Sequence, residues 1–332
     1  MIRRPPRSTL SSSSAASDVY KRQVPLKAGQ AEICACGIAS LFAQEGVFMF
    51  ADKKWGPMKV YNMFNNIGRN GQTVATAKDA NIKTMADLKG KRVTWVKGSP
   101  ALNGNMAGFL AFGGLTWDDV IKVEVSGYGA SANAVINGQA DASMGSSVSS
   151  IFNKTNASPR GLFFPPMPHN DEVSWKRAIA TAPHFAKAVV TNFVGSSDSN
   201  KSFEGMNYPY PIFVTMETTS EDLSYHLTEA VMNNYDQFKD SGPGMDGYQL
   251  SNQNFSWIFP YHPGAVKFYK KKGVWTSKHD KHNANLIKRQ DVLAKAWQKT
   301  LKANLSGDAF KKKWLENRAS ALKAAGMPNA YN

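Results

Sequence analysis

Two segments about a hundred residues apart carry the same order of features, and this repeat most constrains the fold. Residues 25–37 read PLKAGQAEICACG and residues 134–145 read AVINGQADASMG. Each copy has a helix-like tail, Gly-Gln-Ala, an acidic residue and a run of small residues ending in glycine. Ligands of open α/β sheets bind at the carboxyl ends of strands, so two such units predict two lobes facing a shared cleft. Because helices commonly end in glycine, two unrelated helix–strand units remain the alternative.

The rest of the chain alternates short apolar strands with helices and becomes mostly helical beyond residue 220. The expected strands are residues 32–37, 59–66, 72–79, 92–96, 122–126, 140–145, 161–165 and 208–216. The expected helices are residues 84–90, 99–114, 130–138, 146–155, 171–182, 220–238, 262–273 and 283–303. This alternation predicts a mainly parallel, doubly wound α/β architecture, and 332 residues suit two domains.

The first 23 residues differ from the rest of the chain. They are basic and Ser-rich, without apolar periodicity and without the apolar core of a signal peptide. They resemble translated adapter sequence, and we expect a non-native tail at residues 1–23. On this interpretation the natural N-terminus is missing, and the export signal is lost with it. The segment carries +4 of the formal charge of +15.

The remaining charge argues against a nucleic-acid partner. Most lysines are scattered, the only triplets lie at 270–272 and 311–313, and the chain has no Arg-rich arm with interleaved aromatic residues. Solvated helix faces are the simpler interpretation. No run of 18 apolar residues occurs, so no membrane span is expected.

The two cysteines, Cys34 and Cys36, predict neither a disulfide nor a metal site. A bridge across one intervening residue is strained, and two ligands leave a metal site incomplete. We expect two small buried side chains and no metal.

One glycine motif has the form of a dinucleotide fingerprint. Residues 127–132 read GYGASA between a strand and a helix, but no acidic residue follows at the end of the next strand, since Asp141 comes too early. No nicotinamide, flavin or other cofactor is therefore expected. The backbone geometry of this motif still favours an anion. Gly127 and Gly129 allow backbone N–H groups to converge at a helix start, which suits a carboxylate or phosphate.

A second anion-binding candidate begins at Ser99, which follows the strand at 92–96. Ser99 either caps the helix or also faces a ligand, and both can hold at once. Asn103 and Asn105 are poor choices inside a helix, which favours a polar task for at least one of them. No G-x-S-x-G, Walker loop or His-Glu-x-x-His occurs, so no catalytic residues are expected and the chain is not expected to be an enzyme.

Five segments together resemble one family, the TAXI-type solute receptors of TRAP transporters. They read TMADLKGKRV…GSPALN, GGLTWDDV, GYGASANAVINGQADASMG, YPYPIFVTM and PYHPGAVKFYKKKGVW, in collinear order over about residues 24–300. The resemblance implies a periplasmic, monomeric type II periplasmic binding protein of two doubly wound α/β lobes joined by a hinge. It would hand a small organic acid or amino acid, such as glutamate, glutamine or 2-oxoglutarate, to a sodium-driven TRAP membrane subunit.

The resemblance also implies lobe boundaries and ligand contacts. Lobe one would hold residues 24–90 and 207–332, and lobe two residues 91–206. Helix starts and hydroxyls would neutralise the ligand carboxylate. The contacts carried over by position are Gly37, Ile38, Ala39, Ser40, Ser99, Ala101, Asn103, Tyr128, Gly129, Ser131, Gly145, Ser146, Tyr208 and Tyr210. For the two tyrosines of YPYP, packing at a rigid strand entry is the alternative.

One departure from the family pattern is expected at the start of lobe one. The first strand and helix of the family should precede Val24, where this chain has the adapter-like tail. Two other function classes stay open: an enzyme on the same scaffold, and a ligand-sensing module that acts on a partner protein. The enzyme would need a reactive Cys, Lys or acid pair in the cleft, whereas the expected loops offer Ser, Asn, Tyr and Gly.

Overall fold

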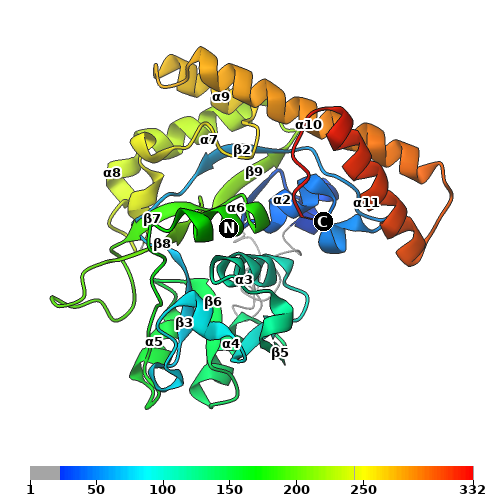
Figure 1. Ribbon diagram of the computed structural model, residues 1–332. Coiled ribbons are helices and arrows are strands. Elements are labelled where there is room, and N and C mark those ends of the chain that lie inside the picture. The colour runs from blue at the N-terminus through cyan, green and yellow to red at the C-terminus, as the bar shows by residue number, and fades with distance from the viewer. Residues whose placement is uncertain (1–22, 243, 332) are drawn as a thin grey trace, which may run out of the picture.

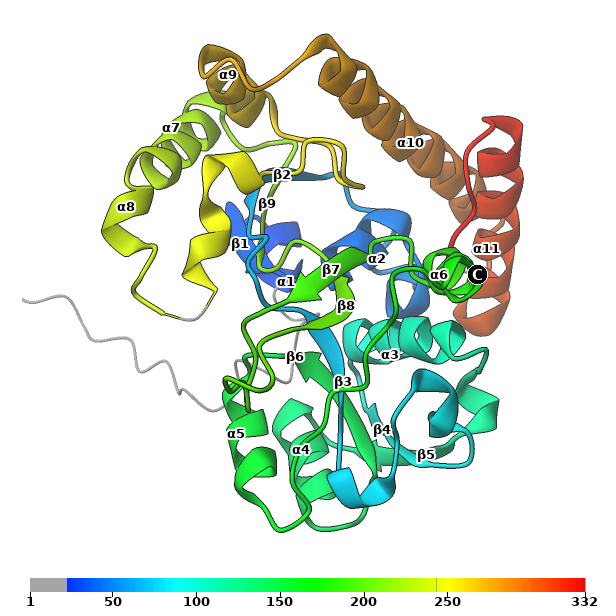
Figure 2. The ribbon, with the colours of Figure 1, turned by 60° about the vertical axis from the view of Figure 1, so that its left-hand side comes forward.

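The computed structural model describes residues 23–242 and 244–331, which form two α/β lobes with one sheet each (Figures 1 and 2). The predicted fold class, two α/β lobes joined by crossing segments, is confirmed. The predicted non-native tail lies outside the described residues except for Gln23. That residue is buried at the start of the first described helix, α1 (Gln23–Lys27). No helix in the described ranges has the length and apolar character needed to cross a membrane.

Lobe one contains a three-stranded sheet in the order β1-β9-β2 (Ile33–Cys36, Ile212–Met216 and Val60–Asn65). Both neighbours run antiparallel to β9. The parallel arrangement expected here is therefore wrong for this sheet, because β9 enters from the other lobe and runs back between two strands of the N-terminal segment. The helices of this lobe are α1, α2 (Ala39–Glu45), α7 (Glu221–Asn233), α8 (Tyr235–Phe238), α9 (Pro263–Lys271), α10 (Ser277–Leu301) and α11 (Gly307–Ala324).

Lobe two contains a six-stranded mixed sheet in the order β5-β4-β6-β3-β8-β7. Only its first three strands form the parallel, doubly wound part, with β4 between β5 and β6. The strands are β3 (Gln72–Thr76), β4 (Arg92–Val96), β5 (Ile121–Val125), β6 (Ala142–Ser146), β7 (Ala186–Val190) and β8 (Phe203–Asn207). The helices are α3 (Pro100–Phe112), α4 (Tyr128–Ile136), α5 (Ser150–Ala157) and α6 (Glu172–Thr181).

Two short segments, residues 66–71 and 208–211, carry the chain between the sheets. They lie side by side: the Tyr210 amide donates to the Asn66 carbonyl (2.8 Å), and the Asn66 amide donates to the Pro211 carbonyl (3.3 Å). The first crossing therefore comes before β3, because β3 pairs with β6 and β8 of lobe two, and not near residue 90 as the sequence suggests. The paired crossings are the natural hinge between the lobes.

The structure differs from the sequence analysis at several further places, and helices α2 and α11 were not among the expected helices. Residues 161–165 form only an isolated bridge between Phe163 and Thr76 instead of a strand. Strands β7 and β8 were not expected, since most of β7 is solvent-exposed and β8 follows a polar, turn-rich stretch. The Sγ atoms of Cys34 and Cys36 are joined in a disulfide, so the expectation of two unlinked side chains is wrong.

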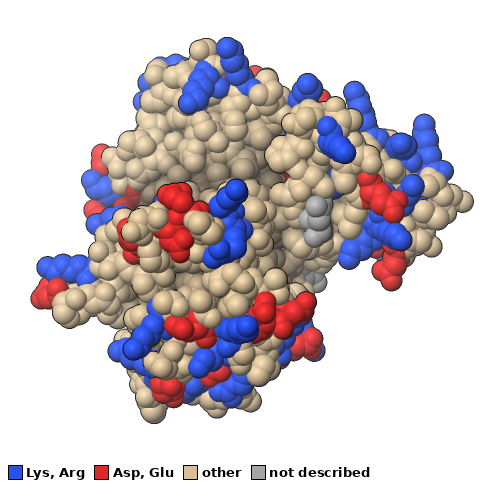
Figure 3. All heavy atoms as spheres, in the orientation of Figure 1, with Lys and Arg blue, Asp and Glu red and all other residues tan. Residues whose placement is uncertain are grey.

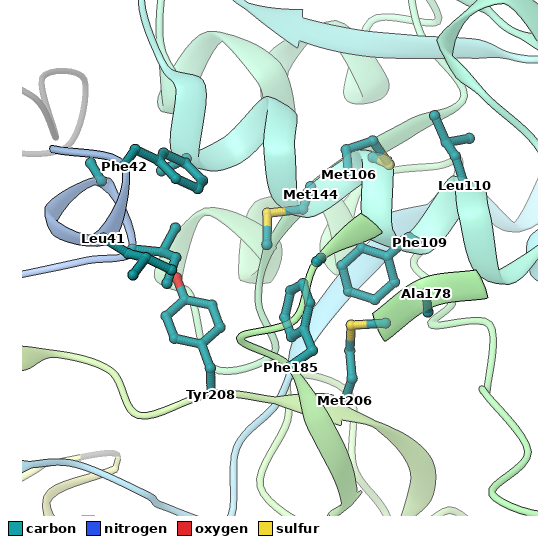
Figure 4. Packing of buried hydrophobic residues seen from close by; sticks show 14 of the residues in the cluster. Leu41, Phe42, Met106, Phe109, Leu110, Met144, Ala178, Phe185, Met206 and Tyr208 are labelled. Atoms are coloured by element: carbon teal, nitrogen blue, oxygen red, sulfur yellow. The ribbon is translucent and has the colours of Figure 1, made fainter. Parts of the chain in front are cut away.

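The largest hydrophobic cluster runs across the boundary between the lobes (Figure 4). Leu41 and Phe42 of α2, in lobe one, belong to the same cluster as Phe109 of α3 in lobe two. Gly104 of α3 is close to this contact, because a Cβ there would lie 3.3 Å from the Phe42 ring. The two lobes are therefore packed directly against each other beside the hinge.

A buried ion cluster holds α2 against the two C-terminal helices. The Glu45 carboxylate accepts hydrogen bonds from Arg289 of α10 (2.7 Å) and from Arg318 of α11 (2.6 Å). Arg318 is fully buried and Glu45 is 2% exposed. Burial opposes the charged carboxylate, but the two guanidinium groups outweigh it and lower the pKa of Glu45. The same arginines donate to the backbone of the C-terminal tail at Pro328 and Ala330.

Candidate ligand-binding cleft

A cleft of about 410 Å³ lies where the two lobes and the hinge meet. Lobe one, lobe two and the second crossing segment all contribute to its wall. The lining residues are Gly37, Ile38, Gln72, Ala101, Leu102, Asn105, Tyr128, Gly145, Ser146, Val148, Ser149, Tyr208 and Tyr210. None of these residues carries a formal charge, so the cleft offers hydroxyl, amide and backbone groups.

Eight of the fourteen residues expected from the family resemblance come together in this wall: Gly37, Ile38, Ala101, Tyr128, Gly145, Ser146, Tyr208 and Tyr210. They derive from segments that are far apart in sequence, including both copies of the repeat. Tyr208 also packs, with its ring centroid 5.2 Å from that of His184. The two alternatives for the YPYP segment, packing and cleft lining, therefore hold together for this residue.

Two expected contacts, Ser99 and Asn103, lie on the other side of α3. They line a separate cavity of about 610 Å³ together with Trp95, Trp117 and Tyr331. The Asn103 amide is occupied: its Oδ1 accepts from the Val96 amide and its Nδ2 donates to the Val96 carbonyl, both at 2.9 Å. Asn103 thus fastens α3 to the end of β4 and does not line the cleft.

Four further expected contacts also lie outside the cleft wall. Ala39 and Ser40 are fully buried inside α2, where Ser40 accepts a hydrogen bond from Gln23 (3.0 Å). Ser131 is 1% exposed, and its hydroxyl donates to the Tyr128 carbonyl (2.6 Å) within α4. Gly129 faces open space. Ala39, Ser40 and Gly129 are each one or two positions from a lining residue, and the turn of the helix points them elsewhere.

The first turns of three helices form part of the wall. Ala101 and Leu102 begin α3, Tyr128 begins α4, and Ser149 is the N-cap residue of α5. First-turn N–H groups have no partner within their own helix, and the helix dipole adds partial positive charge there. This arrangement favours an anion without a lysine or arginine in the cleft.

Two phenol groups stand between the lobes as neutral donors. Burial raises the pKa of Tyr128 to about 12 and also raises the pKa of Tyr208. Both therefore remain protonated at neutral pH. Tyr128 is held tightly, because a Cβ at Gly145 would lie 2.2 Å from its hydroxyl oxygen. Only glycine leaves room at this position of β6 for the phenol to point into the cleft.

A chain of hydrogen bonds fixes which way the Tyr208 hydroxyl points. Tyr331 bonds to Nδ1 of His184 (3.0 Å), Nε2 of His184 bonds to Oδ1 of Asn105 (2.9 Å), and Nδ2 of Asn105 donates to the Tyr208 hydroxyl oxygen (3.4 Å). Because that oxygen already accepts a hydrogen bond, its own proton is left to donate into the cleft. Asn105 was noticed in the sequence as a poor helix residue, but nothing there predicted the role of His184.

Because His184 is buried as a neutral imidazole, we expect the folded protein to lose stability in acid. Burial lowers its pKa to about 3, whereas the unfolded chain binds the proton near pH 6.5. The unfolded state therefore holds more protons between these values, and the free energy of unfolding falls as the pH drops below 6.5. Between pH 7 and pH 5 the His184→Gln variant should lose about 2 kcal/mol less than the natural chain. Urea unfolding at both pH values measures this, and equal losses in the two proteins would contradict it.

Comparisons with known proteins identify one family and several solved structures that the chain is similar to. Residues 9–273 match the NMT1-like family, and the chain belongs to that family. Among curated proteins no match to the chain is found.

Solved structures with a similar fold include three solute-binding proteins. The periplasmic aliphatic sulphonate binding protein SsuA from Escherichia coli is 14% identical, with a TM-score of 0.43 over 89% of this chain and 79% of that one. An ancestral arginine-binding protein bound to arginine is 15% identical, with a TM-score of 0.38 over 67% and 75%. An ABC transporter periplasmic binding protein from Brucella ovis with glutathione bound is 12% identical, with a TM-score of 0.36. It is matched over 69% of this chain and 60% of its own length. Likenesses of this size carry no information on which solute this chain binds.

Proposed function

We propose that the protein is an extracytoplasmic solute receptor that closes its two lobes on a small carboxylate. The observation that carries this proposal is the cleft wall, which combines three helix starts with the neutral donors Tyr128 and Tyr208. Its volume of about 410 Å³ falls within the range of small-molecule sites. The paired crossing segments supply the hinge on which such a receptor closes.

The donor set narrows the class of ligand. Hydroxyl protons and helix N–H groups stabilise carboxylate oxygens, while the cleft wall provides no acidic side chain to pair with a ligand cation. Small organic acids such as 2-oxoglutarate fit this description, whereas the ammonium group of glutamate or glutamine would meet only neutral acceptors among these lining residues. The sequence resemblance to TAXI receptors adds the periplasm as location and a TRAP-type membrane subunit as the recipient of the solute.

Two alternatives share the scaffold. An enzyme would need a nucleophile with an adjacent base, and the cleft wall brings together no such pair of described side chains. A ligand-sensing module would use the same cleft and hinge but pass the closure to a partner protein. Catalysis and metal or cofactor use are therefore not part of the proposal.

A thermal unfolding screen tests the proposal. C4 to C6 dicarboxylates and acidic or amide amino acids are added at neutral pH, with nucleotides as the comparison set. A fitting acid at a hundredfold excess over its dissociation constant should add about 2.7 kcal/mol to the free energy of unfolding. Stabilisation by nucleotides alone would overturn the receptor assignment.

A further inference from the structure

The positive charge of the chain is concentrated in its last seventy residues. Residues 263–332 contain sixteen lysines and arginines against four acidic residues, a formal charge of +12. Residues 23–262 carry a formal charge of −1. In the structure the positive segment comprises α9, α10 and α11, and their basic side chains stand along the upper and right-hand rim of lobe one (Figure 3). The excess positive charge of the described chain therefore lies on one side of lobe one.

Helix α10 carries five of these lysines on a single face, and its C-cap residue, Lys302, continues that face. At about 100° per residue they fall within roughly 120° of arc, along a 25-residue helix about 37 Å long. The buried residues of α10, including Leu293 and Trp297, lie on a neighbouring face, centred about 120° around the helix axis from the lysines. We call this set the α10 lysine stripe: Lys278, Lys281, Lys288, Lys295, Lys299 and Lys302.

The stripe lysines are free to meet an external partner. All six are exposed, and within the described part of the chain no carboxylate lies within 4.0 Å of any of them. The ion pairs on neighbouring segments, such as those of Lys270 with Asp280 and Lys313 with Glu316, involve other lysines. The stripe is thus an uncompensated row of positive charge.

The same surface offers no apolar anchor. Within residues 263–331 none of the large hydrophobic side chains is exposed to the extent seen at Val173 or Ile121 of lobe two. Protein interfaces take most of their binding energy from a few buried aromatic or aliphatic anchors. Membrane-inserting helices likewise present an apolar face. A surface of exposed lysines alone suits electrostatic attraction to a plane of negative charge.

We propose that the α10 lysine stripe binds the anionic phospholipid surface of a bilayer, which holds the receptor close to the membrane. Each lysine near such a surface contributes about a fivefold gain in affinity. The attraction falls as salt shortens the screening length, from about 10 Å at 0.1 M to about 3 Å at 1 M. This binding is independent of the cleft, so it can be present or absent whatever solute the cleft binds.

Vesicle sedimentation with the full chain tests the proposal. The protein is mixed with vesicles of phosphatidylcholine alone or with about one third phosphatidylglycerol. We expect binding only to the anionic vesicles and its loss in high salt. Combined replacement Lys281→Gln, Lys288→Gln and Lys295→Gln should weaken binding on the order of a hundredfold, with an unchanged thermal unfolding midpoint.

A matched variant separates the stripe from net charge. Lys83→Gln, Lys154→Gln and Lys176→Gln remove the same charge from exposed positions away from α10 and should leave vesicle binding nearly unchanged. Equal losses in the two variants would overturn the proposal. So would equal binding to neutral vesicles. Stripe-dependent binding to duplex DNA or to an acidic protein, without binding to anionic vesicles, would assign the stripe to that partner instead.

Discussion

Replacement of Glu45 by Gln should lower the free energy of unfolding by about 3–5 kcal/mol. The charge of the fully buried Arg318 would then lack its counter-ion, and one of the two acceptor oxygens would be replaced by an NH2 group that faces a guanidinium. Arg318 also donates to the Glu45 backbone carbonyl (3.1 Å), and this bond remains after the substitution. The guanidinium of Arg318 is therefore held in the interior without a negative charge beside it. Urea unfolding at neutral pH measures the loss.

The control for this prediction is an ion pair on the surface. Glu217 contacts Lys59 at 3.2 Å, and its side chain is 56% exposed. Glu217→Gln should therefore cost less than about 1 kcal/mol. If both substitutions lower the free energy of unfolding equally, the buried ion cluster does not stabilise the contact between α2 and the C-terminal helices as we propose.

Replacement of Gly145 by Ala should weaken binding of the solute at least about tenfold, the equivalent of 1.4 kcal/mol. The new Cβ would lie 2.2 Å from the Tyr128 hydroxyl and 2.8 Å from the ring of Phe152. Because Phe152 is fully buried, the tyrosine side chain has to move into the space that the ligand occupies. Calorimetric titration with the acid found in the thermal screen measures the change.

Gly129→Ala is the matched control for this substitution. Gly129 lies on α4, one residue after Tyr128, and a Cβ there meets no atom within 4 Å. Alanine also favours the helix over glycine by up to about 1 kcal/mol. This variant should bind the solute with the affinity of the unsubstituted chain. A loss of affinity as large as that of Gly145→Ala would contradict the displacement of Tyr128 as the cause of the weaker binding.

The elements most accessible to prediction were those whose signals are local. Thr84 with Asp87, and Pro100 with the glycines at 113 and 114, define helix ends by hydrogen bonding and backbone geometry within a few residues. The strand at 92–96 was predicted with its observed bounds. Strand β7 was missed because an edge strand that is mostly exposed lacks the apolar run that marks a buried one.

The sequence allowed a prediction of where in the fold a cleft would lie, but not of which individual residues line it. Strand ends and the family resemblance predicted that Gly37, Tyr128 and Gly145 come together, and the structure places all three in one wall. Helix periodicity alone could not say which face of α3 meets the other lobe, so it did not decide between Asn103 and Asn105, which point about 160° apart. His184 and Tyr331 reach the cleft only through side-chain contacts made in the folded state.

A crystal structure grown with the most stabilising acid tests the central claim most directly. The account predicts that the ligand carboxylate lies between the lobes, within hydrogen-bond distance of the Tyr208 hydroxyl and of first-turn amides of α3, α4 or α5. A ligand found instead in the cavity beside Trp95 and Trp117, with the cleft wall at Tyr208 untouched, would contradict it.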